Sequence, residues 1–269
     1  MAREFDFYIV PTPIGNIQDI TIRAIEILKT VDLIACEDTR VTQKLLNHYD
    51  IKTKCVSYHK YNEKERIGYF LDVLRDGKKI ALVSDAGTPM ICDPGAIIVS
   101  ELINSGFSVS SLPGACAVTT FLSEIPRDNE NFTFIGFMPR SEKQIEDVSK
   151  KLTDHNFVFY ESPERILKTL KIIQSIRGDI KVALGRELSK LFEEVLVDNI
   201  SSILCHFKDG IKGEIVCMVY AIKDFDTTEM EYRIKELKDK GFRDKDIAII
   251  LATLFEYNKN EVYKKCLEV

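Results

Sequence analysis

The sequence predicts an α/β protein with two sheet-containing domains and a small helical tail, and three observations lead to this class. In the first half, apolar runs typical of strands alternate with amphipathic helical segments, which indicates a parallel sheet. At residues 126–129 a proline followed by polar residues interrupts the pattern, as expected at a domain boundary. No strand signal follows Lys223. We therefore expect domains at 1–128 and 129–222 and a helical tail at 223–269.

The elements expected in the first domain follow from local composition. Its strands carry aromatic, β-branched or continuous apolar residues, and they are 5–10, 32–36, 79–83 and 107–112. Its helices show apolar residues at helical spacing, and they are 19–30, 41–48, 62–76, 94–105 and 115–122. The run 79–83 is almost wholly apolar, which is typical of a strand covered on both faces.

The second domain and the tail show a different pattern. The expected strands are 132–137, 157–160, 181–185, 193–196 and 214–222, and the expected helices are 142–152, 163–176 and 199–207. Two or three helices should form the tail, separated at 241–242 and at 257–258. Acidic and basic residues nearly balance in the tail, so it is not a polybasic arm.

Length and composition are those of an ordinary globular protein. The chain has 269 residues, of which 45% are hydrophobic and 29% charged, so it can bury a sizeable core. Its apolar runs, such as Ile247–Leu254, are far shorter than the ~20 residues that span a membrane. The acidic start Met1–Asp6 lacks the apolar core of a signal peptide. We therefore expect a cytoplasmic protein without membrane contact.

Cysteine, histidine and charge patterns exclude several classes of protein. The 7 cysteines form no C-x-x-C pair and the 4 histidines are scattered, so we expect reduced thiols and no metal. The net charge of −5 gives no argument for nucleic-acid binding, although a local basic face can coexist with an acidic total.

Three loops carry the strongest functional signal. Residues 11–16, 84–89 and 113–117 follow predicted parallel strands and are rich in Gly, Pro, Ala and small polar residues. The carboxyl ends of parallel strands meet at one edge of a sheet, where ligands bind. Small residues let a ligand approach backbone N–H groups closely. The sequence lacks the P-loop, the G-x-G-x-x-G fingerprint and the G-x-S-x-G elbow, so this pocket belongs to another class of site.

The longer motifs resemble one known family. In chain order they are Tyr8–Asn16, Asp32–Arg40, Leu82–Pro89, Asp93–Gly95, Leu112–Gly114, Gly136–Pro139, Phe159–Pro163, Arg186–Lys190 and Lys212–Val216. Together they resemble the tetrapyrrole (corrin/porphyrin) methylase superfamily, and within it the enzymes that methylate the ribose 2′-oxygen of a cytidine in 16S ribosomal RNA. The resemblance runs from about Phe7 to Val219, and the helical tail is similar to an appendage of many members.

This resemblance implies a fold, a cofactor and partners. The fold is two α/β domains of the tetrapyrrole methylase type with a cleft between them that holds S-adenosyl-L-methionine. The implied partners are 16S rRNA in the small ribosomal subunit and a second copy of the chain in a homodimer. Matched position by position, the implied cofactor-binding residues are Pro13, Ile14, Ser84, Asp85, Gly87, Thr88, Ile91, Cys116, Ala117, Tyr160, Gly185, Arg186, Gly213 and Glu214.

The sequence does not single out the catalytic group. Methyl transfer to a ribose hydroxyl needs in-line positioning and removal of the hydroxyl proton. The polar candidates in the matched motifs are Asp38, Arg40, His59, Glu161, Glu187 and Lys190. Ordinary structural roles compete with catalysis, because Asp38 can cap a helix, His59 can lie in a turn, and Lys190 can form a surface ion pair.

Candidate RNA contacts and two alternative functions stay open at this point. Phosphate contacts are expected from Arg127, Arg140, Lys143, Arg165, Lys168 and Lys171, and base stacking from Tyr58, Tyr61 or Phe137. The first alternative is a methylase that acts on a tetrapyrrole macrocycle. The second is a non-catalytic binding protein in ribosome assembly.

Overall fold

The computed structural model describes residues 4–127, 131–221, 227–255, 257 and 259–268. It divides into two compact units, Met1–Tyr220 and Ala221–Val269. Both predicted domain boundaries, 128/129 and 222/223, fall on residues outside those described.

The first sheet is parallel throughout, as predicted. Among the described residues it has five strands in the order β3-β2-β4-β1-β5. The strands are β1 (Phe7–Ile9), β2 (Leu33–Cys36), β3 (Cys55–Ser57), β4 (Ile80–Val83) and β5 (Val109–Ser111). Strand β3 was not predicted, because its three residues are too short for a recognisable strand pattern. It forms by pairing with β2 at the edge of the sheet.

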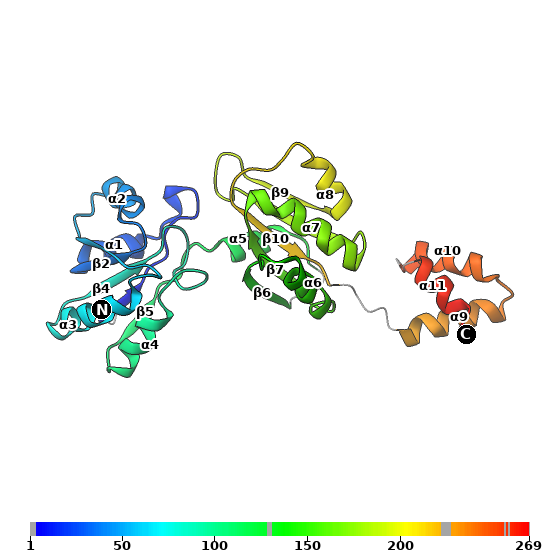
Figure 1. Ribbon diagram of the computed structural model, residues 1–269, viewed down its shortest axis with the longest axis horizontal. Coiled ribbons are helices and arrows are strands. Elements are labelled where there is room, and N and C mark those ends of the chain that lie inside the picture. The colour runs from blue at the N-terminus through cyan, green and yellow to red at the C-terminus, as the bar shows by residue number, and fades with distance from the viewer. Residues whose placement is uncertain (1–3, 128–130, 222–226, 256, 258, 269) are drawn as a thin grey trace. The chain divides into compact units, whose positions relative to one another are not determined.

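Helices cover both faces of this sheet (Figure 1). They are α1 (Ile22–Thr30), α2 (Thr39–His48), α3 (Glu63–Arg75) and α4 (Ala96–Asn104). Leu28 of α1 and Leu46 of α2 pack on one face, whereas Phe70 of α3 and Leu102 of α4 pack on the other. Helix α1 starts later than predicted, because residues 17–19 form a separate 3₁₀ turn and Thr21 caps the α-helix.

The chain crosses to the second sheet after β5. Helix α5 (Ala117–Glu124) packs its Phe121 and Leu122 against residues of the second sheet. This crossing brings the loop after β5 next to the second sheet, which positions the site described below.

The second sheet is mixed. Its five strands, counted among the described residues, run in the order β6-β7-β10-β8-β9, with β6 and β7 parallel and the other pairs antiparallel. The strands are β6 (Phe132–Phe137), β7 (Asn156–Glu161), β8 (Lys181–Arg186), β9 (Glu194–Asn199) and β10 (Ile215–Val219). Helices α6 (Glu142–Lys151), α7 (Pro163–Arg177) and α8 (Ile200–His206) cover one face, and α5 covers the other.

The tail is helical, as predicted. Its described helices are α9 (Thr227–Asp239), α10 (Asp244–Phe255) and α11 (Lys259–Cys266). They enclose a small core that includes Ile234, Leu251 and Val262. Gly241, with φ at +85°, lies at the predicted break between α9 and α10, whereas the second predicted break includes residue 258, which lies outside the described residues. Within the described ranges, the helices lack the length and apolar character needed to traverse a bilayer.

Candidate functional site

The loops after β1, β4 and β5 meet at the carboxyl edge of the first sheet, as predicted. Thr12 and Gly87 exchange backbone hydrogen bonds of 2.9 and 3.0 Å. The Thr88 hydroxyl donates to the Ala115 carbonyl over 2.8 Å. These bonds join the three loops into one fixed surface.

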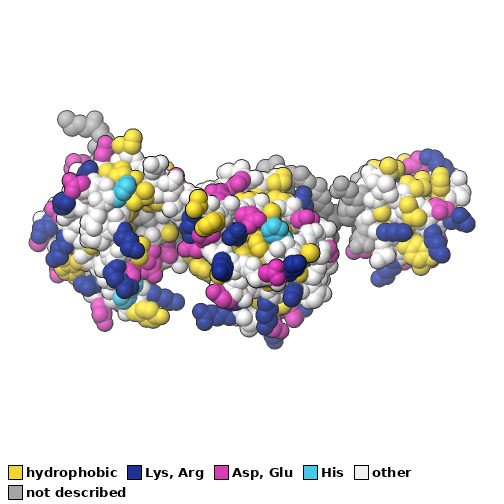
Figure 2. All heavy atoms as spheres, turned by 90° about the horizontal axis from the view of Figure 1, so that it is seen from above, with side chains coloured by type: hydrophobic (Ala, Val, Ile, Leu, Met, Phe, Trp, Pro, Cys, Tyr) yellow, Lys and Arg dark blue, Asp and Glu magenta, His cyan; other side chains and the backbone are white. Residues whose placement is uncertain are grey.

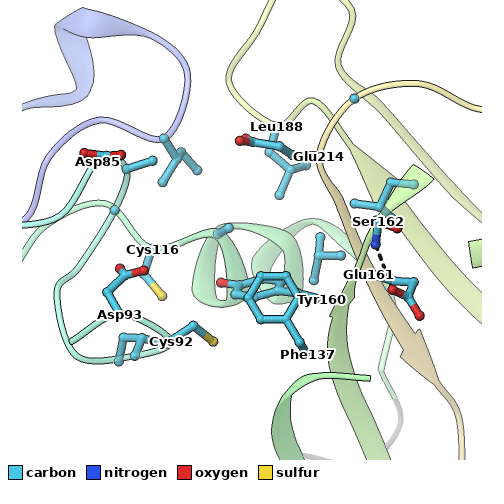
Figure 3. Close-up of a pocket in the computed structure, with 18 of the residues that line it drawn as sticks. Asp85, Cys92, Asp93, Cys116, Phe137, Tyr160, Glu161, Ser162, Leu188 and Glu214 are labelled. Carbon is cyan, nitrogen blue, oxygen red and sulfur yellow. Dashed lines mark hydrogen bonds between the residues drawn. The ribbon is translucent and has the colours of Figure 1, made fainter. Parts of the chain in front are cut away.

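This surface forms one wall of a pocket, and the second sheet forms the other wall (Figure 3). The cavity has a volume of about 450 Å³. Its lining residues are Ile14, Asp85, Ala86, Gly87, Thr88, Ile91, Cys92, Asp93, Cys116, Ala117, Phe137, Tyr160, Glu161, Ser162, Pro163, Leu188, Gly213, Glu214, Ile215 and Val216. The site therefore depends on both halves of the first unit.

The wall from the first sheet is acidic. Asp85 and Asp93 line it, and burial raises the pKa of both carboxyls, with each raised further by nearby carboxylates. The pKa of Glu37 is also raised, first by burial and then by charge repulsion from Asp93. The Asp38 backbone N–H holds Asp85 in place with a 3.0 Å hydrogen bond. A positively charged ligand group would offset this crowding of carboxyls.

The wall from the second sheet combines aromatic and aliphatic side chains with the carboxyl groups of Glu161 and Glu214. Tyr160 contacts Phe137 edge-on, with 5.5 Å between ring centroids, and burial raises the pKa of the Tyr160 hydroxyl. Leu188, Ile215 and Val216 extend the apolar surface. Such a wall suits a flat, apolar ligand group.

A glycine keeps one corner of the pocket open. Gly213 has φ at +95°, and an added Cβ would lie 2.3 Å from Cγ of Glu187. The Glu187 carboxylate accepts the Glu214 N–H over 2.9 Å and binds the Lys190 ammonium over 2.8 Å. Glu187 and Ser189 themselves have positive φ, at 52° and 64°. Surrounding contacts thus hold this loop in a conformation that costs backbone energy.

Most residues predicted to bind the cofactor line the pocket. They are Ile14, Asp85, Gly87, Thr88, Ile91, Cys116, Ala117, Tyr160, Gly213 and Glu214. The others do not line it. Pro13 only precedes Ile14, and the Ser84 hydroxyl donates to the Gly87 carbonyl over 3.1 Å. Gly185 lies against Phe121, and Arg186 is paired with Glu194 at 2.7 Å.

The predicted catalytic candidates, all of them described residues, are not brought together. Asp38 caps α2 and pairs with Arg40 at 2.6 Å, which lowers the pKa of Asp38 to about 2. The Nδ1 of His59 accepts the Tyr61 N–H in a turn. Glu187 and Lys190 form an ion pair beside the pocket.

Glu161 is the member of this set that lines the pocket. Its side chain is buried, and its oxygens accept from the Ser162 N–H at 2.8 Å and the Thr169 hydroxyl at 2.9 Å. Arg165 also pairs with it at 3.1 Å.

Sequence reasoning missed several lining residues. They are Ala86, Cys92, Asp93, Ser162, Pro163, Leu188, Ile215 and Val216. All of them except Cys92 lie within the matched motifs, and Ala86 also lies in the loop 84–89, so the motifs were a signal that could have found them. Apart from Asp93 they are ordinary apolar or small residues, and their local pattern does not show that the packing of the two sheets brings them to one cavity.

Some of the predicted RNA-contact residues are engaged within the protein, and the others are exposed and unpaired among the described residues. Arg165 donates to the Met138 and Pro139 carbonyls, Lys168 pairs with Glu142, and Arg127 lies over the Phe132 ring. Arg140, Lys143 and Lys171 are exposed and have no ion-pair partner in the described part of the chain. Basic and acidic side chains are intermixed on the face seen in Figure 2.

The three aromatic residues predicted to stack a base differ in exposure and in whether they line the pocket. The Tyr58 ring is buried, and its hydroxyl donates to Glu63 over 2.5 Å, so the prediction that it could stack a base was wrong. Tyr61 is exposed but does not line the pocket. Phe137 is exposed and lines it.

Comparison with known proteins identifies the class to which this fold and pocket belong. Residues 6–204 match the family of Tetrapyrrole (Corrin/Porphyrin) Methylases, so the chain belongs to that family. Uroporphyrin-III C-methyl transferase from Thermus thermophilus, solved complexed with S-adenyl homocysteine, has the same fold with a TM-score of 0.56 at 16% identity. The similarity covers 79% of this chain and 96% of that chain.

Two sequence relatives show to which group within the methylase family the chain belongs. Ribosomal RNA small subunit methyltransferase I of Vibrio cholerae is 38% identical over 270 residues, which cover 97% of this chain and 94% of the relative. The protein of the same name from a Hydrogenobaculum species is 45% identical over 218 residues, which cover 79% of this chain and 94% of that relative. The chain is a member of the ribosomal RNA small subunit methyltransferase I family.

Proposed function

We propose that this protein transfers the methyl group of S-adenosylmethionine to the ribose 2′-oxygen of a cytidine in 16S ribosomal RNA of the small subunit. The observation that carries this proposal is the 38% identity to the Vibrio cholerae relative along 97% of the chain. The similarity includes the helical tail as well as the pocket.

The pocket residues fit S-adenosylmethionine. Asp85 and Asp93 suit its positive sulfonium group, and Tyr160, Ile215 and Val216 suit its flat adenine. The loops after β1, β4 and β5 offer backbone polar groups at close range. When bound, the cofactor supplies an activated methyl group. The two walls then contribute by orienting the reactants and excluding water.

A ribose hydroxyl also needs a proton acceptor to become a good nucleophile. Glu161 is engaged with Thr169 and Arg165, and Glu214 is paired with Lys190. Asp93 lines the pocket and has no ion-pair partner among the described residues, and burial raises its pKa above the ordinary value. We therefore add Asp93 to the predicted candidates as the acceptor.

A methyl-transfer assay tests the reaction and its substrate. Tritium-labelled S-adenosylmethionine is offered with isolated small subunits, with naked 16S rRNA and with uroporphyrinogen. The proposal expects label in the RNA at a ribose 2′-oxygen. Label in the macrocycle and none in RNA would identify a tetrapyrrole methylase instead. Binding of the cofactor without transfer to any of the three would contradict the proposed reaction.

Cysteine labelling tests the cofactor pocket independently of any RNA. Cys92 lines the pocket and is exposed, whereas Cys205, which is also exposed, does not line it. The pocket walls partly desolvate the Cys92 thiol and raise its pKa to about 11, so labelling with a maleimide is followed at mildly alkaline pH, where more of the reactive thiolate is present. S-adenosylmethionine should slow the labelling of Cys92 and leave Cys205 unchanged, as measured by mass spectrometry. Equal labelling of Cys92 with and without the cofactor would place the ligand elsewhere.

Localisation and assembly complete the proposal. We expect the enzyme to act in the cytoplasm as a homodimer, which the family resemblance implies. Sedimentation equilibrium of the purified protein checks the dimer, and a monomer at all concentrations would contradict it.

A further inference from the structure

Phe137 is an exposed aromatic residue at the pocket. It is the last residue of β6, and the residue is 63% exposed. The side chain nevertheless lines the cavity beside Tyr160 (Figure 3). A large apolar side chain that remains exposed contributes little to folding, and exposed apolar surface at a pocket often marks a ligand contact.

An irregularity in the sheet sets where Phe137 lies. Strand β6 pairs with β7 in register from Phe132 to Phe134, and the register shifts before Phe137 pairs with Tyr160. Gly136 has φ at +72°, a conformation that favours glycine. Bulges of this kind turn a side chain away from the regular alternation and are frequent next to active sites.

The segment that carries Phe137 is firmly held. The Met138 N–H donates to the Tyr160 carbonyl over 3.0 Å, and the Met138 side chain is buried. Arg165 donates to the carbonyls of Met138 and Pro139. The Phe137 ring itself contacts Tyr160 edge-on. The ring is thus fixed by its neighbours while much of its surface stays open.

The surroundings suit a nucleotide. Arg140 and Lys143 follow Phe137 closely in the chain, are exposed, and lack ion-pair partners among the described residues. A fixed aromatic ring stacks any base, and free cations contact phosphates. Flipped bases in modifying enzymes are held by such aromatic surfaces.

We propose that Phe137 is the platform on which the base of the target nucleotide stacks, a role that rests on the proposed RNA methylation. The adenine of the methyl donor shares the same flat chemistry and is the other source of a stacking base. The exposure of Phe137 favours the RNA base, since Tyr160, which shares this wall, is less exposed and offers the more enclosed ring.

Four variants distinguish stacking on the RNA base from stacking on the adenine of the cofactor. Phe137→Ala and Phe137→Leu remove the ring, and Leu keeps the apolar volume. Phe137→Tyr keeps the ring. Phe192→Ala is the matched control, because Phe192 is a phenylalanine of similar exposure that does not line the pocket. Kd for S-adenosylmethionine is measured by calorimetry, and KM for small subunits by methyl transfer.

The loss of stacking on one base corresponds to a rise in KM of roughly 5- to 150-fold. We expect this rise for Phe137→Ala and Phe137→Leu, with Kd for the cofactor unchanged. Phe137→Tyr and Phe192→Ala should behave like the wild type.

A rise in the cofactor Kd of Phe137→Ala with an unchanged KM would assign the ring to adenine and overturn the proposal. Wild-type KM for Phe137→Leu would also overturn it, since the ring would then be dispensable. Wild-type protein that methylates no RNA would instead refute the proposed function, before any variant is compared.

Discussion

At the scale of single residues, Asp93 shows how the pocket affects stability. Burial raises the pKa of its carboxyl above the ordinary value of 3.8. A carboxyl with a raised pKa binds its proton more tightly in the folded protein than in the unfolded chain. The free energy of unfolding therefore falls as the pH rises from that ordinary value through the folded pKa. At neutral pH, the Asp93 carboxylate opposes folding.

Asp93→Asn should change stability and activity in opposite directions. Removal of the half-buried charge should raise Tm at neutral pH, and this gain should shrink as the pH falls toward the ordinary pKa. Loss of the proton acceptor should lower methyl transfer by about 10²- to 10⁴-fold. Thermal unfolding across pH and the tritium assay measure the two effects.

Asp72→Asn, on the exposed surface of α3, is the control and should change neither quantity. A fully active Asp93→Asn variant would remove Asp93 from the mechanism.

The residues of the site were partly predictable. The loop around Gly87 and Thr88 could be predicted, because glycine, proline and small residues after a strand mark a ligand-binding turn. Leu188 and Val216 could not, since an apolar residue in a pocket has the same local pattern as one in a core. His59 was a catalytic candidate, but the alternative of a position in a turn agrees with its contacts.

At the scale of elements, the start of α7 supports the wall of the pocket. Glu161 ends β7 and is buried, and Thr169 from the second turn of α7 donates to it over 2.9 Å. Arg165, one turn earlier, pairs with the same carboxyl and also holds the segment after Phe137. One buried carboxyl thus joins β7, α7 and the end of β6.

Thr169→Val should destabilise the protein by about 1–3 kcal/mol, because a buried carboxyl oxygen loses its hydroxyl donor. Ser175→Ala is the matched control on the same helix, where an exposed hydroxyl bonds only to the Ile172 carbonyl. Its effect should stay within about 0.5 kcal/mol. Urea unfolding measures both, and equal effects would show that the Thr169 bond contributes nothing specific.

Elements were predicted best where their local pattern was strong. The run that forms β4 and the periodic segments that form α3 and α7 have clear signals within a few residues. Strand β3 was missed, because only its pairing with β2 makes three residues a strand. The bulge before Phe137 likewise depends on the partner strand.

At the scale of the whole molecule, the pocket and the tail belong to different compact units. Every residue that lines the pocket lies between Ile14 and Val216, within the unit Met1–Tyr220. The tail unit has its own core, which includes Ile247, Tyr257 and Val262. Each unit therefore buries apolar surface by itself.

Removal of the tail after residue 221 should leave the first unit folded and its affinity for S-adenosylmethionine unchanged. Calorimetry on the fragment 1–221 and on the full chain measures the two affinities, and circular dichroism checks the fold. A fragment that is folded but does not bind the cofactor would show that the tail contributes to the site.

The sequence alone determined the alternation of strands and helices, the helical tail and the composition of the three loops that meet at the pocket, because backbone preferences and hydrophobic periodicity act over a few residues. Tertiary structure decided that α5 leaves the first sheet to pack on the second. It also decided that Asp93, Phe137 and Leu188 share one cavity. These outcomes depend on contacts between distant segments, whose packing no local pattern encodes.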